Sequence, residues 1–182
     1  MVYKKILIFI FIFVFFLRLP SLFEPFTYGD EGIYLTLGQA MRKGVVLYKE
    51  IHDNKPPLLY FLAAIAANFS TFRLMLFFWS FLTIYCFFKL AATLFPKKQS
   101  AVFLSTGIFA VLSSLHSFEG NVANAENFMM LPTLAGFWLI LNAKSSHRVS
   151  TFAHTRCVFG AGVFFALAAL FKIPAAFDFL AA

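Results

Sequence analysis

The chain has 182 residues, of which 61% are hydrophobic and 28 are phenylalanine, and its mean hydropathy is +0.82. Only 13% of the residues are charged, which excludes an ordinary water-soluble domain. The net charge of +7 does not indicate a nucleic-acid partner, because the basic residues stand in short clusters at the ends of apolar segments. We therefore expect an all-α fold, a polytopic transmembrane helical bundle.

The first apolar segment follows Lys4 and Lys5 and has the features of either an uncleaved transmembrane helix or a signal peptide. We expect the helix, because Arg18 and Pro20 follow it where a small-residue cleavage site would stand. A helix that spans a bilayer needs about 20 mostly apolar residues. Five segments are candidate spans: Ile6–Leu22, Leu74–Leu94, Ala101–Leu115, Phe128–Leu141 and Cys157–Phe171.

The first two spans are separated by a long outer loop of roughly residues 20–72. In it Ile33, Leu37, Ala40 and Met41 share one helical face, which predicts an amphipathic helix along the membrane surface, while Glu31 and the basic residues turn elsewhere. The run 58–69 has only twelve residues and follows two prolines, which favours a half-buried helix over a span. Aromatic residues in this loop, Tyr48 and Tyr60, are interpreted as members of an interfacial belt.

Charge predicts the orientation. If residues 58–69 do not cross the membrane, Lys97, Lys98, Arg148 and Arg156 fall on the side of the N-terminus, as the positive-inside rule requires. Seven of the eight acidic residues then fall on the opposite side, although basic residues also occur in the first outer loop. We expect a multi-pass plasma-membrane protein with a cytoplasmic N-terminus.

The chain stops beside a further apolar run, without a closing cluster of charge. We expect residues 1–182 to be the N-terminal part of a longer protein, with about five spans. Near its end, Lys172 stands just before Pro174 and is interpreted as a snorkelling lysine at a proline-broken helix end.

Acidic residues concentrate in the first outer loop. Because carboxylates are costly near lipid, we expect them to cluster where the function needs them, so this loop is the predicted functional site. Asp30 is either a general base or the N-cap of the helix that follows. Glu31 and Glu126 each stand near the start of a helix, where an acid also stabilises the helix dipole. Lys55 is either a phosphate ligand or an interfacial anchor.

Several motifs follow one another in a specific order: Arg18-Leu19-Pro20, Asp30-Glu31, Gly44 with Leu47-Tyr48, Asp53-Asn54-Lys55-Pro56-Pro57-Leu58 with Tyr60, and Asn124-Ala125-Glu126-Asn127. In this order they resemble the N-terminal part of the GT-C membrane glycosyltransferases, in the branch of the protein mannosyltransferases and the aminoarabinose transferase of lipid A. The resemblance covers all 182 residues in topology. Its specific signal is confined to the Asp-Glu pair, the Gly-x-x-x-Tyr step and the Lys-Pro-Pro step.

This resemblance implies an inverting transferase that moves a sugar from a polyprenyl-phosphate-linked donor to an acceptor hydroxyl at the outer face of the membrane. The acceptor would be a lipid, a glycan or a protein. The resemblance makes Asp30 the catalytic base and assigns Glu31, Lys55 and Glu126 to substrate binding. A positioned carboxylate suits deprotonation of a hydroxyl, and a lysine suits a departing phosphate.

Metal binding and other functions stay open. Glu50, His52 and Asp53 are oxygen and nitrogen ligands within four residues, but they share no clear geometry. The aminoarabinose transferase has an acidic ligand directly before its lysine, where this chain has Asn54, so no metal ligand is assigned and a divalent metal stays open as a cofactor. The alternative functions are a polytopic transporter or a non-catalytic membrane subunit. Membrane lipids are expected partners in each case, and nucleic acid in none.

Overall fold

A computed structural model of the chain describes residues 2–25, 28–145 and 151–181. Their regular structure is helical throughout, apart from an isolated bridge between Leu47 and Ile51, so the predicted all-α class is confirmed. The α-helices are α1 (Val2–Arg18), α2 (Gly29–Arg42), α3 (Pro57–Ala66), α4 (Phe69–Leu94), α5 (Gln99–Leu112), α6 (Ala125–Ser145), α7 (Thr151–Ala169) and α8 (Ala176–Ala181). Short 3-10 helices are η1 (Leu19–Leu22), η2 (His116–Phe118) and η3 (Ile173–Ala175).

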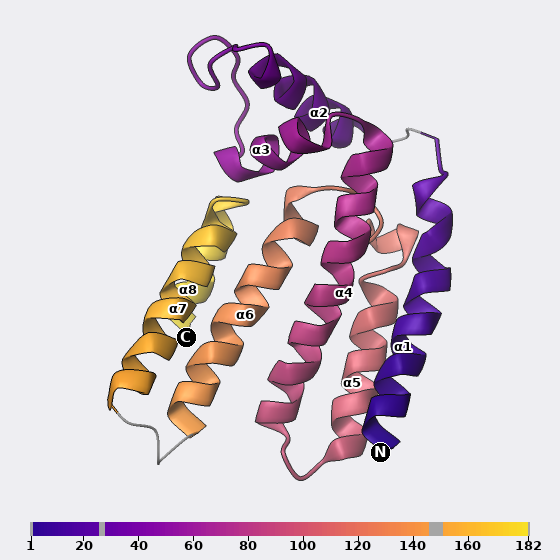
Figure 1. Ribbon diagram of the computed structural model, residues 1–182, viewed down its shortest axis with the longest axis vertical. Coiled ribbons are helices and arrows are strands. Elements are labelled where there is room, and N and C mark those ends of the chain that lie inside the picture. The colour runs from indigo at the N-terminus through magenta and orange to yellow at the C-terminus, as the bar shows by residue number, and fades with distance from the viewer. Residues whose placement is uncertain (1, 26–27, 146–150, 182) are drawn as a thin grey trace.

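Five long helices, α1 and α4 to α7, run side by side along the molecule, and α2 and α3 lie across one end of them (Figure 1). At the opposite end are the start of α1, the α4–α5 turn, the end of α6 and the start of α7 (Figure 1). Lys5 belongs to that end, as do Lys97 and Lys98 in the turn. The acidic residues from Glu24 to Glu126 lie in or beside the connections at the α2–α3 end, where the basic residues Arg42, Lys43, Lys49 and Lys55 also stand.

Two helical segments of the described chain are long and apolar enough to cross a membrane, namely Lys5–Leu22 and Phe69–Leu94. Three further apolar helices are shorter: Pro57–Ala66, Gln99–Leu112 and His154–Ala169. Each of the five predicted spans corresponds to one long helix, although α4 begins at Phe69 rather than at Leu74. An Asn68 side chain that accepts a hydrogen bond from the Thr71 amide caps this earlier start.

The helix that follows the Lys-Pro-Pro step is short, as its sequence predicts. α3 has 10 residues, hence a length of about 15 Å, and it lies across the end of the bundle (Figure 1). It ends at Ala67, whose φ of 64° turns the chain sharply into α4. α3 also packs closely on α2, because a Cβ on Gly38 would lie 2.5 Å from the Ala64 nitrogen.

The buried face of α2 differs from the predicted one. Ile33, expected on the apolar face, is 48% exposed, whereas Glu31, expected elsewhere, is buried together with Tyr34, Leu35 and Gly38. The prediction of the face was therefore wrong in part, because hydrophobicity alone decided it. Glu31 faces the inside of the bundle because it pairs with the buried guanidinium of Arg73, as described below.

The end of α1 is tied to the loop between α5 and α6 by a buried guanidinium. Arg18 donates to the Ser113 carbonyl at 2.8 Å, to the Ser114 hydroxyl at 3.3 Å and to the Gly120 carbonyl at 2.7 Å. A side chain on Gly120 would meet the Ser113 carbonyl at 2.3 Å, so this close approach requires glycine. The first and second loops of the α2–α3 end are thereby held together.

Candidate functional site

Asp30 lies in the first turn of α2, partly exposed, and one of its carboxylate oxygens accepts a hydrogen bond. The donor is the hydroxyl of Tyr34, one turn further along the helix, at 3.0 Å from Oδ2. The N-cap position belongs to Tyr28, and no side chain forms a capping hydrogen bond there. The interpretation of Asp30 as an N-cap was therefore wrong, and its carboxylate is directed by a tyrosine instead.

Glu31 lies on the inner side of the same turn, with none of its side chain exposed. The Nη2 atom of Arg73 lies 2.8 Å from Oε2, and the Nε atom lies 3.3 Å from both carboxylate oxygens. The Ala123 amide donates to Oε1 at 2.8 Å. The Glu31 carboxylate is thus occupied by groups of the protein itself and has no surface for a ligand, so its position is that of a buried counter-ion.

Arg73 extends this arrangement to the loop that precedes α2. Its Nη1 atom donates to the Glu24 carbonyl at 2.7 Å and to the Ser21 carbonyl at 3.3 Å, and its side chain is only 7% exposed. One guanidinium therefore joins α4, η1 and α2, and Glu31 adds the segment before α6. The backbone that carries Asp30 is fixed by these contacts.

Lys55 stands in a turn that is closed by three side chains, those of Tyr48, Asp53 and Tyr60. Asp53 accepts a hydrogen bond from the Tyr60 hydroxyl at 2.7 Å and another from the Asn54 amide at 2.7 Å. The Tyr60 hydroxyl accepts in turn from the Lys55 amide at 3.3 Å, and the Tyr48 hydroxyl donates to the Lys55 carbonyl at 2.5 Å. The Lys-Pro-Pro step is thereby a defined turn rather than an open loop.

Glu126 lies in the first turn of α6 and forms an ion pair with Lys172, the residue just before η3. Burial opposes ionisation of Glu126, but the contact with Lys172, its own backbone amide and the positive charge of Lys55 together hold its pKa below the ordinary value of 4.5. The side chain is 45% exposed, so the pair can be reached from solvent. Glu126, a predicted site residue, is thus paired with Lys172, for which the sequence predicted no partner.

These groups come from four segments and meet at one end of the bundle. The Leu58 amide donates to the Leu170 carbonyl at 3.2 Å, which brings the Lys55 turn to the end of α7, beside Lys172. The negative charge of Glu126 reaches Tyr34, the hydroxyl of which binds Asp30. We refer to Asp30, Lys55, Glu126 and Lys172 as the polar cluster.

Three tyrosines surround the polar cluster and remain hydrogen-bond donors over a wide pH range. Burial raises the pKa of Tyr34 and of Tyr60, and the hydrogen bonds to Asp30 and Asp53 raise them further. Burial also raises the pKa of Tyr28 to about 12, with a contribution from the hydrogen bond to Glu119. Tyr60 is completely buried, so its interpretation as an interfacial-belt residue was wrong.

The described residues contain no group of three or more His, Cys, Asp and Glu side chains placed as metal ligands would be. Of the residues considered for a metal, Asp53 binds Asn54 and Tyr60, and Glu50 accepts from the Val46 amide at 2.7 Å. The ring of His52 packs against Tyr48 instead, with ring centroids 6.0 Å apart. These three side chains organise the loop locally.

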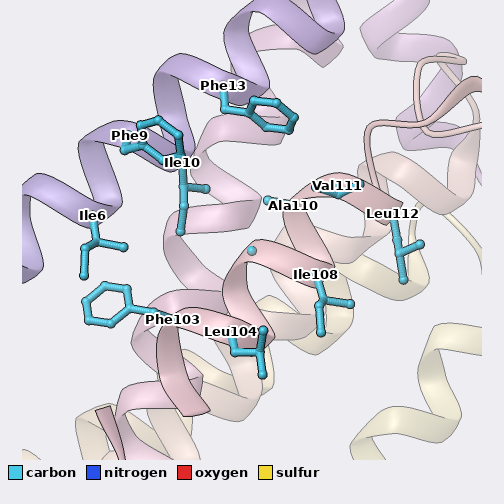
Figure 2. Close-up of a pocket in the computed structure, with 11 residues that line it drawn as sticks. Ile6, Phe9, Ile10, Phe13, Phe103, Leu104, Ile108, Ala110, Val111 and Leu112 are labelled. Atoms are coloured by element: carbon cyan, nitrogen blue, oxygen red, sulfur yellow. The ribbon is translucent and has the colours of Figure 1, made fainter. Parts of the chain in front are cut away.

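A hollow of about 770 Å³ opens between α1 and α5. Figure 2 shows Ile6, Ile10 and Phe13 of α1 facing Phe103 and Ile108 of α5, and every labelled side chain is apolar. This hollow offers no group that can bind a charge or move a proton. The polar cluster is therefore the candidate site for chemistry.

Two features of the site were absent from the sequence-based prediction. Arg73 stands in an apolar helix, and only its position near the start of that helix hints at a buried partner. Lys172 was noted as a boundary lysine, but its pairing with Glu126 joins residues 46 positions apart. Neither pairing has a local signature in the sequence.

Comparisons with known proteins leave the family open. No family model, curated protein or solved structure matches this chain.

Proposed function

We propose that this chain belongs to a multi-pass membrane glycosyltransferase that uses a polyprenyl-phosphate-linked sugar, with the polar cluster as part of its active site. The observation that supports this most is the position of Asp30, Lys55, Glu126 and Lys172 at one end of an apolar helical bundle, where Lys172 pairs with Glu126 and the charges of Asp30 and Glu126 both act on Tyr34. A lipid-linked donor needs reactive groups at the depth of the lipid headgroups. The polar cluster lies at the end where α2 and α3 cross the bundle.

In this proposal Asp30 is the general base. The hydroxyl of a lipid, glycan or protein acceptor gives its proton to the Asp30 carboxylate as its oxygen attacks the anomeric carbon of the sugar. The new carbon–oxygen bond forms while the bond to the lipid phosphate breaks on the opposite face, so the configuration inverts. Asp30 suits this role because its carboxylate is partly exposed and is held by the hydroxyl of Tyr34.

The departing phosphate takes the electron pair of the broken bond and needs nearby positive charge. Lys55 supplies it from a turn that three side-chain contacts hold in place. Lys172 is close by, paired with Glu126, and an incoming phosphate competes with that carboxylate for the ammonium group. Glu31 is not among the substrate contacts of this proposal, because Arg73 and the Ala123 amide occupy it.

The proposed topology places the N-terminus in the cytoplasm and the polar cluster on the outer face of the plasma membrane. The exposed Lys5, Lys97 and Lys98 at the opposite end of the bundle support it, because cytoplasmic segments carry an excess of basic residues. In this arrangement α1 and α4 to α7 are the five spans, and α2 and α3 lie in the outer interface.

The test is transfer of a labelled sugar from a polyprenyl-phosphate donor by the full chain in proteoliposomes, wild type against Asp30→Asn. We expect a loss of at least about a hundredfold in turnover, as for removal of a general base. Glu24→Gln is the matched control, since Glu24 is also an acid of the first loop, and its side chain approaches His116, at 3.7 Å, rather than the polar cluster. Equal turnover of wild type and Asp30→Asn would remove Asp30 as the base, and solute uptake without sugar transfer would favour a transporter.

A further inference from the structure

Two buried tyrosines stand between the two acidic turns of the first loop. The rings of Tyr34 on α2 and Tyr60 on α3 make an edge contact, with centroids 6.0 Å apart, and each side chain is at most 1% exposed. Their hydroxyls point to different carboxylates, that of Tyr34 to Asp30 and that of Tyr60 to Asp53. A single packed pair of rings therefore touches both the base of the proposed reaction and the turn that carries Lys55.

Tyr34 controls the orientation of the Asp30 side chain. An aspartate at the exposed start of a helix has several rotamers, and a hydrogen bond from residue i+4 selects one that places the carboxylate within reach of that donor. The ring of Tyr34 is fixed in turn by burial among Leu59, Ala63 and the other residues of the main core cluster. A rigid donor thus holds a partly exposed carboxylate.

Tyr60 controls the Lys55 turn in a different way. Its hydroxyl donates to the Asp53 carboxylate and accepts from the Lys55 amide, so it closes the turn from both sides. Pro56 and Pro57 follow directly and restrict the backbone after Lys55. The Tyr60 hydroxyl thus fixes the stretch of the turn before the two prolines, residues 53–55.

We propose that Tyr34 and Tyr60 are a pair of positioning residues, in which Tyr34 orients Asp30 toward the acceptor and Tyr60 holds Lys55 in place for the donor phosphate. This inference rests on the proposed function and adds that the two tyrosines position two different groups of the site. Neither hydroxyl contacts a reacting atom, so both act through the residues that they bind. Their close packing ties the two turns to one core, because movement of either ring displaces the other.

The kinetic test compares Tyr34→Phe and Tyr60→Phe, which each remove one hydroxyl and keep the ring. We expect Tyr34→Phe to lower kcat about tenfold with the donor KM unchanged, and Tyr60→Phe to raise the donor KM about fivefold with kcat nearly unchanged. Tyr85→Phe is the control, because Tyr85 is an exposed tyrosine of α4. Both variants behaving like Tyr85→Phe while Asp30→Asn is inactive would overturn the inference and leave the proposed function intact.

A second test does not depend on activity. We expect labelling of Asp30 by a water-soluble carbodiimide, mapped by mass spectrometry, to rise several-fold in Tyr34→Phe and to stay unchanged in Tyr60→Phe. We expect hydrogen exchange at the Asn54 and Lys55 amides to accelerate in Tyr60→Phe only. Unchanged labelling and exchange would refute the positioning contacts themselves. If Asp30→Asn transferred sugar as fast as the wild type, the role of Asp30 in the proposed function and the catalytic part of this inference would both be wrong.

Discussion

The buried ion pair between Glu31 and Arg73 provides the most direct test of how this fold is held together. Arg73→Met removes the guanidinium and keeps most of the side-chain volume. It leaves the Glu31 carboxylate, with none of its surface exposed, without a cation, and it leaves the Glu24 carbonyl without its 2.7 Å donor. The Ala123 amide alone still binds Glu31.

Removing one partner of a buried ion pair costs about 3–5 kcal/mol, because a charge stays buried without compensation. Arg18→Met is the matched control, since Arg18 is equally buried but donates only to two carbonyls and a hydroxyl. Its loss leaves neutral acceptors unpaired, at about 1–3 kcal/mol. The double variant Glu31→Gln with Arg73→Met removes both charges and keeps an acceptor for the Ala123 amide. We expect it to recover about 2 kcal/mol relative to Arg73→Met alone.

The assay is unfolding of the purified protein in mixed micelles by increasing fractions of a denaturing detergent, followed by far-ultraviolet circular dichroism. The midpoints should fall in the order wild type, Arg18→Met, double variant and Arg73→Met, with the middle two close together. The reasoning is refuted if Arg73→Met is no less stable than Arg18→Met. It is also refuted if neutralising Glu31 brings no recovery, because the cost would then come from lost packing rather than from an unpaired charge.

Two further predictions concern helix packing and pH. Gly38→Ala should destabilise the protein by about 1–3 kcal/mol, because the added Cβ would lie 2.5 Å from the Ala64 nitrogen. The control is Gly107→Ala on α5, which meets no atom within 4 Å and should be neutral or stabilising. Thermal unfolding of the two variants measures the difference. The ion pair with Lys172 lowers the pKa of Glu126, so its stabilisation is complete above the ordinary value of 4.5 and is lost as the pH falls through the lower value in the folded state. Wild type should therefore exceed Glu126→Gln in unfolding temperature at pH 6 to 7, and the difference should shrink as the pH falls below 4.5; a difference that does not shrink in acid would contradict the pairing.

Much of the fold follows from periodicity and composition. The five long helices were predicted because each apolar run has about the length of a bilayer-spanning helix. The short helix after Pro57 was predicted from its length and from the two prolines. The predicted span began at Leu74, whereas α4 begins at Phe69 and includes Arg73 as a buried residue.

The candidate site was harder to predict than the fold, because its contacts join segments that are distant in sequence. Residue type and local position identified Asp30, Lys55 and Glu126 as chemical groups, since each stands at a helix start or in a rigid turn. The same reasoning assigned Asp30 as the base and Glu31 to substrate binding, but it could not predict which of the two is buried. Both are acids of one helical turn, and only the position of Arg73, 42 residues away, decides which is buried.

The geometry of the helix explains why Asp30 and Glu31 differ in exposure. Adjacent residues on a helix point about 100° apart, so when one carboxylate faces the core the other faces the rim of the bundle. The Arg73 guanidinium stabilises Glu31 in the inward position, and this fixes the rotation of α2 that leaves Asp30 partly exposed beside Tyr34. One buried cation in an apolar helix therefore determines which of two neighbouring acids is available for chemistry.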